Sequence, residues 1–150
     1  MKGVHPMETL RFSDFLDSYI QTMPDSMQDG MLYRLTYAEN LTRLTFYVTF
    51  PQLVPANDLF SLEKTLQQAL EIETVRIAPN YAATLCQTAY FPELLQLLKR
   101  EQPVVNGFFD HAQIQQDGQN WTITLKNGGY EIVQRYHVAE QLQNLLQRLF

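Results

Sequence analysis

The segment 43–50 alternates strictly between apolar and polar side chains, and this alternation constrains the fold more than any other feature of the sequence. The apolar positions are Leu44, Phe46, Val48 and Phe50, and the polar or amphipathic positions between them are Arg43, Thr45, Tyr47 and Thr49. Successive side chains of a β-strand point to opposite faces, so this period of two is typical of a strand with one buried face. The rest of the chain must therefore supply helices that cover one face of a sheet.

A second alternating run precedes this strand. The residues predicted to share one of its faces are Met31, Tyr33, Leu35 and Tyr37. With a turn at Glu39 and Asn40, the two runs predict an antiparallel hairpin. Pro51 and Pro55 end the second strand, because proline cannot donate a hydrogen bond to a sheet ladder.

Two amphipathic helices are predicted to cover this sheet. The first, with Ser13 as its candidate cap, has the stripe Phe12, Phe15, Leu16 and Tyr19. The second, capped by Asn57 or Asp58, has the stripe Leu59, Leu62, Leu66, Ala69 and Leu70. Its residues predicted to face solvent are Glu63, Lys64, Gln67 and Gln68. A third strand at 74–77 completes an α-β-β-α-β domain over residues 1–79, with Ala78-Pro79-Asn80 as the junction.

The sequence of residues 80–150 predicts a second small α+β domain, with its elements in the order α-α-β-β-α. Helical patterns over 81–90 and 93–101 come first, and the leucines expected to be buried are Leu94, Leu95, Leu97 and Leu98. Pro103 and Asn106-Gly107 end this part. Asp117-Gly118 then predicts a tight hairpin between strands 112–116 and 121–125, because both residues tolerate positive φ.

One last helix is predicted over 130–150. Its stripe consists of Val133, Tyr136, Ala139, Leu142, Leu146 and Leu149. No glycine cap, trailing proline or polar tail follows this helix. We therefore expect the native chain to continue beyond residue 150, with a final strand of the second domain missing from the sequence.

The composition excludes several classes of protein. With 45% hydrophobic residues the chain lies outside the range of intrinsic disorder. Its 11 basic and 16 acidic residues give a net charge of −5, which disfavours a broad nucleic-acid-binding face and leaves only weak, local DNA contact. A single cysteine, Cys86, allows no internal disulfide, and neither a signal peptide nor a membrane-spanning apolar run is evident. A cytoplasmic protein with no membrane contact is expected.

No constellation of catalytic residues is found in the sequence. The histidines lack metal-ligand spacing, and there is no nucleophile elbow, Walker loop or dinucleotide fingerprint. We therefore predict no catalytic, cofactor-binding or metal-binding residue. Segment 43–50 also shares Arg43 and its Val-x-Phe ending with the aromatic strand of RNA-recognition modules, but Leu44 and Phe46 stand where that motif requires small residues. A core strand is the favoured interpretation.

The pattern of the whole chain resembles the N-terminal region of the PolC-type DNA polymerase III alpha subunit. The first carriers of this resemblance are the strand 44–50, Leu53-Val54-Pro55 and the leucine-rich helix that follows. Further carriers are segment 94–98, Pro103, Asn106-Gly107 and the passage from Ile114 to Tyr136. The similarity covers residues 10–150.

This resemblance implies a position and a role. In that family two small domains precede the catalytic parts, so the parent chain would be a DNA-directed DNA polymerase, a nucleotidyltransferase, with 3'-5' exonuclease activity. The second domain also looks like the KH-like N-terminal domain of DnaA and the C-terminal domain of the clamp-loader tau subunit, which are protein-docking modules. The fragment would thus be noncatalytic and would dock the polymerase to replisome proteins such as tau.

Six residues are candidates for an interaction surface: Tyr33, Tyr37, Lys99, Arg100, Tyr130 and Tyr136. For the tyrosines the alternative is packing in a core, and for the basic pair it is compensation of a helix dipole. Two other functions stay open at this point. The chain could be a single-stranded nucleic-acid-binding module, or a small enzyme, which would need a pocket with perturbed titratable groups.

Overall fold

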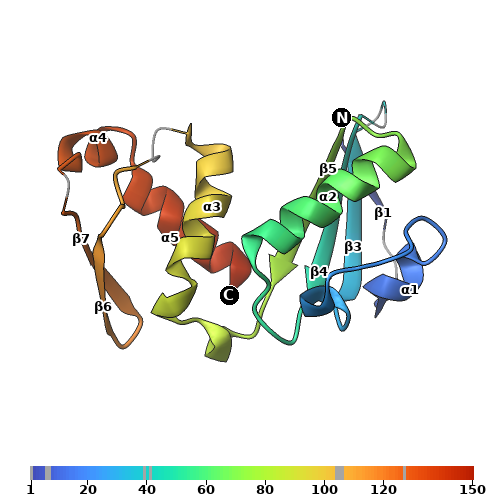
Figure 1. The fold of residues 1–150 in the computed structure, drawn as a ribbon, viewed down its shortest axis with the longest axis horizontal. Helices are drawn as coiled ribbons and strands as arrows, with labels where there is room; N and C mark the ends of the chain where they lie inside the picture. Colours follow the sequence, from blue (N-terminus) through green and yellow to red (C-terminus); the bar gives the residue numbers. More distant parts are fainter. Residues whose placement is uncertain (1, 6–7, 39, 41, 104–106, 127) are drawn as a thin grey trace. The chain divides into compact units, whose positions relative to one another are not determined.

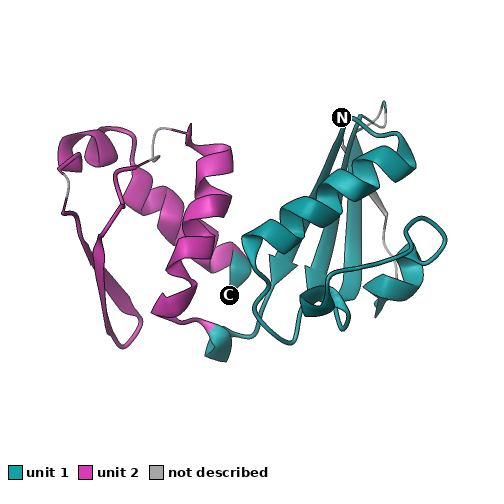
Figure 2. Ribbon diagram, in the orientation of Figure 1, with its two compact units in different colours: residues 1–85, 149–150 teal, residues 86–148 magenta. Residues whose placement is uncertain are grey.

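The computed structural model describes residues 2–5, 8–38, 40, 42–103, 107–126 and 128–150. Contacts between Cα atoms divide the chain into two compact units (Figure 2). The first unit contains residues 1–85 together with 149–150, and the second contains residues 86–148. Both units combine helices with strands, which confirms the mixed α/β composition; the division at residue 79 and the KH-like relationship stay predictions.

The first unit is built on a five-stranded sheet. Its strands are β1 (Lys2–His5), β2 (Leu10–Arg11), β3 (Met31–Ala38), β4 (Arg43–Thr49) and β5 (Thr74–Asn80). The order is β1-β3-β4-β5, and β2 pairs with the beginning of β3. The antiparallel pairing of β3 with β4 confirms the predicted hairpin, whereas β5 runs parallel to β4. The alternation predicts no strand before residue 31, so β1 and β2 are additions to the expected order.

Two helices of this unit pack on one face of the sheet. They are α1 (Phe12–Leu16) and α2 (Ala56–Leu70). In the sequence α2 lies between β4 and β5, and in space it runs across the sheet (Figure 1). The core residues, each at most 2% exposed, include Phe12, Leu16, Leu32, Phe46, Val48, Leu59, Leu62, Leu66, Val75 and Ile77. This burial follows from the predicted alternation of β4 and from the predicted leucine stripe of α2.

Several local predictions for these helices are wrong. Ser13 lies inside α1 rather than before it, and no side chain caps either helix, so Asn57 and Asp58 fall within the first turn of α2. The carboxylate of Asp58 instead accepts a hydrogen bond from the Ser26 hydroxyl at 2.7 Å. The predicted solvent face of α2 is also wrong at Glu63, which is 3% exposed.

Gly30 occupies a buried position just before β3, and its substitution by alanine should destabilise the first unit. A Cβ atom there would lie 2.5 Å from Cε1 of Phe50 and 2.8 Å from Cγ1 of Val48. Because both neighbours belong to the core, we expect Gly30→Ala to lower the free energy of unfolding by about 1–3 kcal/mol, measured by urea titration.

Shortening the neighbour should relieve this crowding. Phe50→Leu removes the ring that the new methyl group meets, so the double variant should be more stable than the sum of the two single effects predicts. Strictly additive effects would show that the side chain of Phe50 does not restrict position 30. Gly118→Ala is the control, since nothing lies within 4 Å of a Cβ there and only the positive φ of +62° opposes it.

The second unit contains three helices and one hairpin. They are α3 (Phe91–Glu101), β6 (Gln113–Asp117), β7 (Asn120–Thr124), α4 (Tyr130–Arg135) and α5 (Val138–Leu149). The antiparallel pairing of β6 with β7 around Gly118 confirms the second predicted hairpin. Leu94, Leu97 and Leu98 are buried as predicted, and Leu95 is half-buried.

Three boundaries of the predicted elements are wrong. Residues 81–90 form two short 3-10 turns, Ala83–Leu85 and Thr88–Tyr90, in place of an α-helix. The last helix is broken, because His137 takes a left-handed conformation with φ +54° between α4 and α5. β5 also continues through the predicted junction to Asn80. Glu39, predicted to form a hairpin turn, and Asn106, predicted to lie where the helical pattern ends, are outside the described residues.

The break at His137 changes which residues are buried. The buried positions that follow it are Val138, Leu142, Leu145 and Leu149. The predicted stripe holds for Leu142 and Leu149, but Ala139 and Tyr136 are exposed. The left-handed residue interrupts the helical phase, so the spacing that runs through Tyr136 does not extend into α5.

Candidate functional site

The sheet of the first unit has a second face, opposite the one that α1 and α2 cover, and we call it the open sheet face. Its exposed or half-buried members include Tyr33, Arg34, Arg43, Thr45, Tyr47 and Arg76. Thr36, which lies opposite Thr45 on the same side, is buried at 7% exposed. The register of the strands defines this face, since Arg34 lies opposite Tyr47 on β4 and Thr45 lies beside Arg76 on β5. Directly paired residues point to the same side of a sheet.

A β-bulge shapes the open sheet face and overturns a prediction. The pairing of β3 with β4 shifts between Leu32 and Arg34, so the chain has one extra residue at Tyr33. Leu32 is fully buried, while Tyr33 is 38% exposed and joins Arg34 beside Tyr47. Tyr37 lies past the bulge, opposite Leu44, and so points to the other side. The predicted shared face of Tyr33 and Tyr37 is therefore wrong, because a bulge reverses the alternation.

Two tyrosines and one arginine form a contact cluster on this face. The ring centroids of Tyr33 and Tyr47 are 6.4 Å apart, with an angle of 55° between the ring planes. The guanidinium carbon of Arg34 lies 5.0 Å from the centre of the Tyr47 ring, within the range of a cation–π interaction. Partial burial raises the pKa of the Tyr33 hydroxyl, the electrostatic interaction with the neighbouring Tyr47 hydroxyl raises it further, and the positive charge of Arg34 lowers it.

The charged residues in strands β2 to β5 are all basic, whereas the described acidic residues of the first unit lie outside these strands. Strands β2 to β5 contain the arginines Arg11, Arg34, Arg43 and Arg76 and no aspartate or glutamate. Arg11, at the start of α1, forms an ion pair with Asp29 at 2.6 Å. The guanidinium of Arg76 donates to the Val75 carbonyl at 3.4 Å. None of the three arginines of the open sheet face was among the predicted interaction residues, although the absence of acidic residues from these segments could have pointed to them.

The outer edge of β5 is closed by hydrogen bonds from elsewhere in the first unit. The N–H of Val75 donates to Oε1 of Gln67 at 3.2 Å, and the N–H of Ile77 donates to Oε2 of Glu63 at 2.8 Å. Further along the strand, Pro79 has no N–H, and the N–H of Tyr81 donates to the carbonyl of residue 149 at 2.7 Å. This edge therefore offers no row of unpaired donors to a partner strand, which disfavours recognition by strand addition there.

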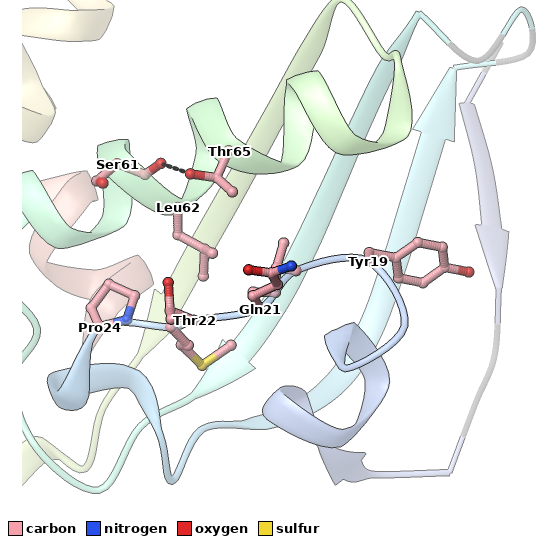
Figure 3. A pocket seen from close by; sticks show the side chains of 9 residues that line it. Tyr19, Gln21, Thr22, Pro24, Ser61, Leu62 and Thr65 are labelled. Carbon is pink, nitrogen blue, oxygen red and sulfur yellow. Dashed lines mark hydrogen bonds between the residues drawn. The ribbon is translucent and has the colours of Figure 1, made fainter.

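A pocket of about 520 Å³ lies between the loop at 19–24 and α2 (Figure 3). Its polar lining includes Gln21, Thr22, Ser61 and Thr65, and the Thr65 hydroxyl donates to the Ser61 carbonyl at 3.0 Å. Tyr19 is the only titratable side chain among its lining residues. Without a carboxylate, imidazole, thiol or amine, the pocket offers no group for acid–base chemistry near neutral pH, and an enzymatic function gains no support from it.

The other predicted site residues lie in the second unit. Lys99 and Arg100 are half-buried in the last turn of α3, where cations compensate the helix dipole. Tyr130 begins α4 and is 67% exposed, and Tyr136 follows its last residue and is 46% exposed. These two tyrosines thus lie at opposite ends of one short helix, with much of each side chain available to a partner.

The described residues offer little support for metal binding or for nucleophilic catalysis. Among them, no group of three His, Cys, Asp or Glu side chains is arranged to hold a metal ion. Burial raises the pKa of the Cys86 thiol, which reduces its reactivity as a nucleophile. Within the same described residues, no helix combines the length and apolar character that crossing a membrane requires.

Most of the first unit matches a known protein family. Residues 11–78 match the family described as DNA polymerase III polC-type N-terminus I. The matched segment begins at the end of β2 and ends within β5, so it contains α1, the β3–β4 hairpin and α2. No curated protein and no solved structure matches the chain. Over residues 11–78 the chain is therefore similar to the first N-terminal domain of polC-type DNA polymerase III.

Proposed function

We propose that this chain is a noncatalytic interaction region of a PolC-type replicative DNA polymerase III alpha subunit and docks it to replisome proteins during chromosomal replication. The family match over residues 11–78 carries this proposal. The polymerase and 3'-5' exonuclease activities would then belong to other parts of the parent protein.

The tau subunit of the clamp loader is the proposed partner, and the second unit is the proposed docking module. Support comes from the exposure of Tyr130 and Tyr136, since aromatic side chains are enriched in protein interfaces. The paired strands β6 and β7 add one half-buried apolar side, formed by Ile114, Trp121 and Ile123. We propose a KH-like arrangement for this unit, in line with its resemblance to docking domains.

Binding to the C-terminal region of tau from the same organism tests this proposal. We expect saturable binding in surface plasmon resonance, and we expect Tyr130→Ala with Tyr136→Ala to weaken it about tenfold or more, as for aromatic residues at the centre of an interface. Tyr19→Ala is the matched control, because Tyr19 is 49% exposed but lies in the first unit. Absence of binding, or equal weakening by the control, would contradict the proposed docking site.

A further inference from the structure

The hairpin of the second unit presents the outer edge of β7. Strands β6 and β7 form a sheet of only two strands (Figure 1). β6 also lies close to the turn Thr88–Tyr90, whereas β7 pairs with β6 alone among the described strands. A sheet of two strands is only marginally stable in water, and further strands or a packed helix stabilise it. The outer edge of β7 is therefore a candidate site for the addition of a strand.

The register of the hairpin determines which backbone groups of β7 face outward. Asp117 and Asn120 close a two-residue turn, so they exchange hydrogen bonds with each other, and so does every second pair along the ladder. Trp121 and Ile123 belong to the pairs in between, so their N–H and C=O groups point away from β6. In the part of the chain that the structure describes, no backbone–backbone hydrogen bond outside the helices and strands involves these two residues.

This edge is complementary to itself. When two copies of β7 run antiparallel about a two-fold axis at Thr122, Trp121 of each copy lies opposite Ile123 of the other, and their outward groups meet in a hydrogen-bonded register. Cross-strand pairs of an aromatic with a β-branched side chain are favourable, and so are pairs of threonines, as at Thr122. We infer that β7 pairs with β7 of a second copy of this chain and forms a continuous four-stranded sheet.

The charges near this edge also favour a second copy as the partner. Strand β7 has no charged residue, so its pairing with itself brings no like charges together. Asp117 lies at the turn end of the hairpin, Lys126 follows the other end of β7, and both are exposed. The antiparallel two-fold arrangement places the end with Asp117 of one copy beside the end with Lys126 of the other. A neutral edge with opposite charges at its two ends thus fits the same edge of a second copy.

The contact is small, so the dimer should be weak. A pair of five-residue strands buries much less than the about 1,200–2,000 Å² of a stable interface. We expect a dissociation constant of about 10 μM to 1 mM. Sedimentation velocity of the complete chain, over concentrations that bracket these values, measures it. Trp121 is the only tryptophan of the sequence, so its emission should shift to shorter wavelength as rising concentration removes it from water.

Substitutions at Thr122 test the register. Thr122→Lys places two lysines directly opposite each other and should raise the dissociation constant about threefold or more, and Thr122→Glu should do the same. An equimolar mixture of the two variants should associate more tightly than either variant alone, because lysine then faces glutamate. A local distortion of the hairpin would not produce this recovery.

Gln115→Lys is the matched control. Gln115 is exposed and is the partner of Thr122 on β6, so it points to the same side of the hairpin. In the proposed dimer the two substituted residues would be three strand spacings apart, about 14 Å, which exceeds the screening length of about 8 Å at physiological salt. The dissociation constant should therefore change by at most about twofold. Far-UV circular dichroism verifies that each variant is folded.

Four results would overturn the inference. They are the mass of a single chain at every concentration, equal weakening by Thr122→Lys and Gln115→Lys, a mixture that associates no more tightly than its components, and a chain extended beyond residue 150 that stays monomeric where residues 1–150 dimerise. The last result would assign the edge to another strand of the same chain. A dimer that each Thr122 variant weakens and their mixture restores would support the inference, independently of any binding to tau.

Discussion

Replacing Phe46 with alanine should lower the free energy of unfolding by about 3–5 kcal/mol, as for other buried phenylalanines. Phe46 is 1% exposed, and its ring centroid lies 5.4 Å from that of Phe12 and 5.9 Å from that of Phe15. On the sheet it is flanked by Leu35 on β3 and Ile77 on β5. The substitution removes contacts to both strands and to α1 at once. Urea unfolding followed by far-UV circular dichroism measures the loss.

Tyr47→Ala is the control within the same strand. It deletes a ring of similar size, but this ring points to the open sheet face and is half-buried. Since less apolar surface returns to water and no closed cavity forms, we expect a loss of at most about 1.5 kcal/mol. Equal losses for the two variants would show that the sheet is buried on both faces, and would contradict the inference of an open sheet face.

Local periodicity predicted the parts of the fold that depend on one face of one element. The alternation of β4 is preserved in its burial, since Phe46 and Val48 are buried and Tyr47 between them is not. The same reasoning failed for β3, where Tyr33 and Leu35 are two residues apart but point to opposite sides. A bulge adds a residue without altering the apolar–polar sequence pattern, so only the pairing with β4 reveals it.

The interaction surface was harder to predict than the core. Sequence reasoning chose exposed tyrosines individually and judged nucleic-acid binding from net charge. The structure shows that Arg34, Arg43 and Arg76 are far apart in the sequence but occupy adjacent strands. Net charge contains no information on such clustering, because strand pairing decides which residues become neighbours.

Replacing Glu63 with alanine should lower the free energy of unfolding by about 2–4 kcal/mol, because it leaves the buried Ile77 amide without its acceptor and also removes buried side-chain volume. The Glu63 carboxylate accepts the N–H of Ile77 at 2.8 Å. Its position four residues after Leu59 and three before Leu66 places it on the apolar side of α2. The leucine stripe left this polar residue for solvent in the prediction, whereas the outward amide of β5 explains its burial.

Glu63→Gln and Glu73→Ala separate the role of this hydrogen bond from the loss of an acidic residue. Glutamine keeps a side-chain oxygen that can accept from Ile77, so we expect about half the destabilisation of the alanine variant or less. Glu73 is exposed, and its removal should change stability by at most about 0.5 kcal/mol. Amide hydrogen exchange provides the site-specific measurement, since the Ile77 amide should exchange faster in Glu63→Ala and stay protected in Glu63→Gln. Unchanged protection of Ile77 in the alanine variant would show that the carboxylate does not close the edge of β5.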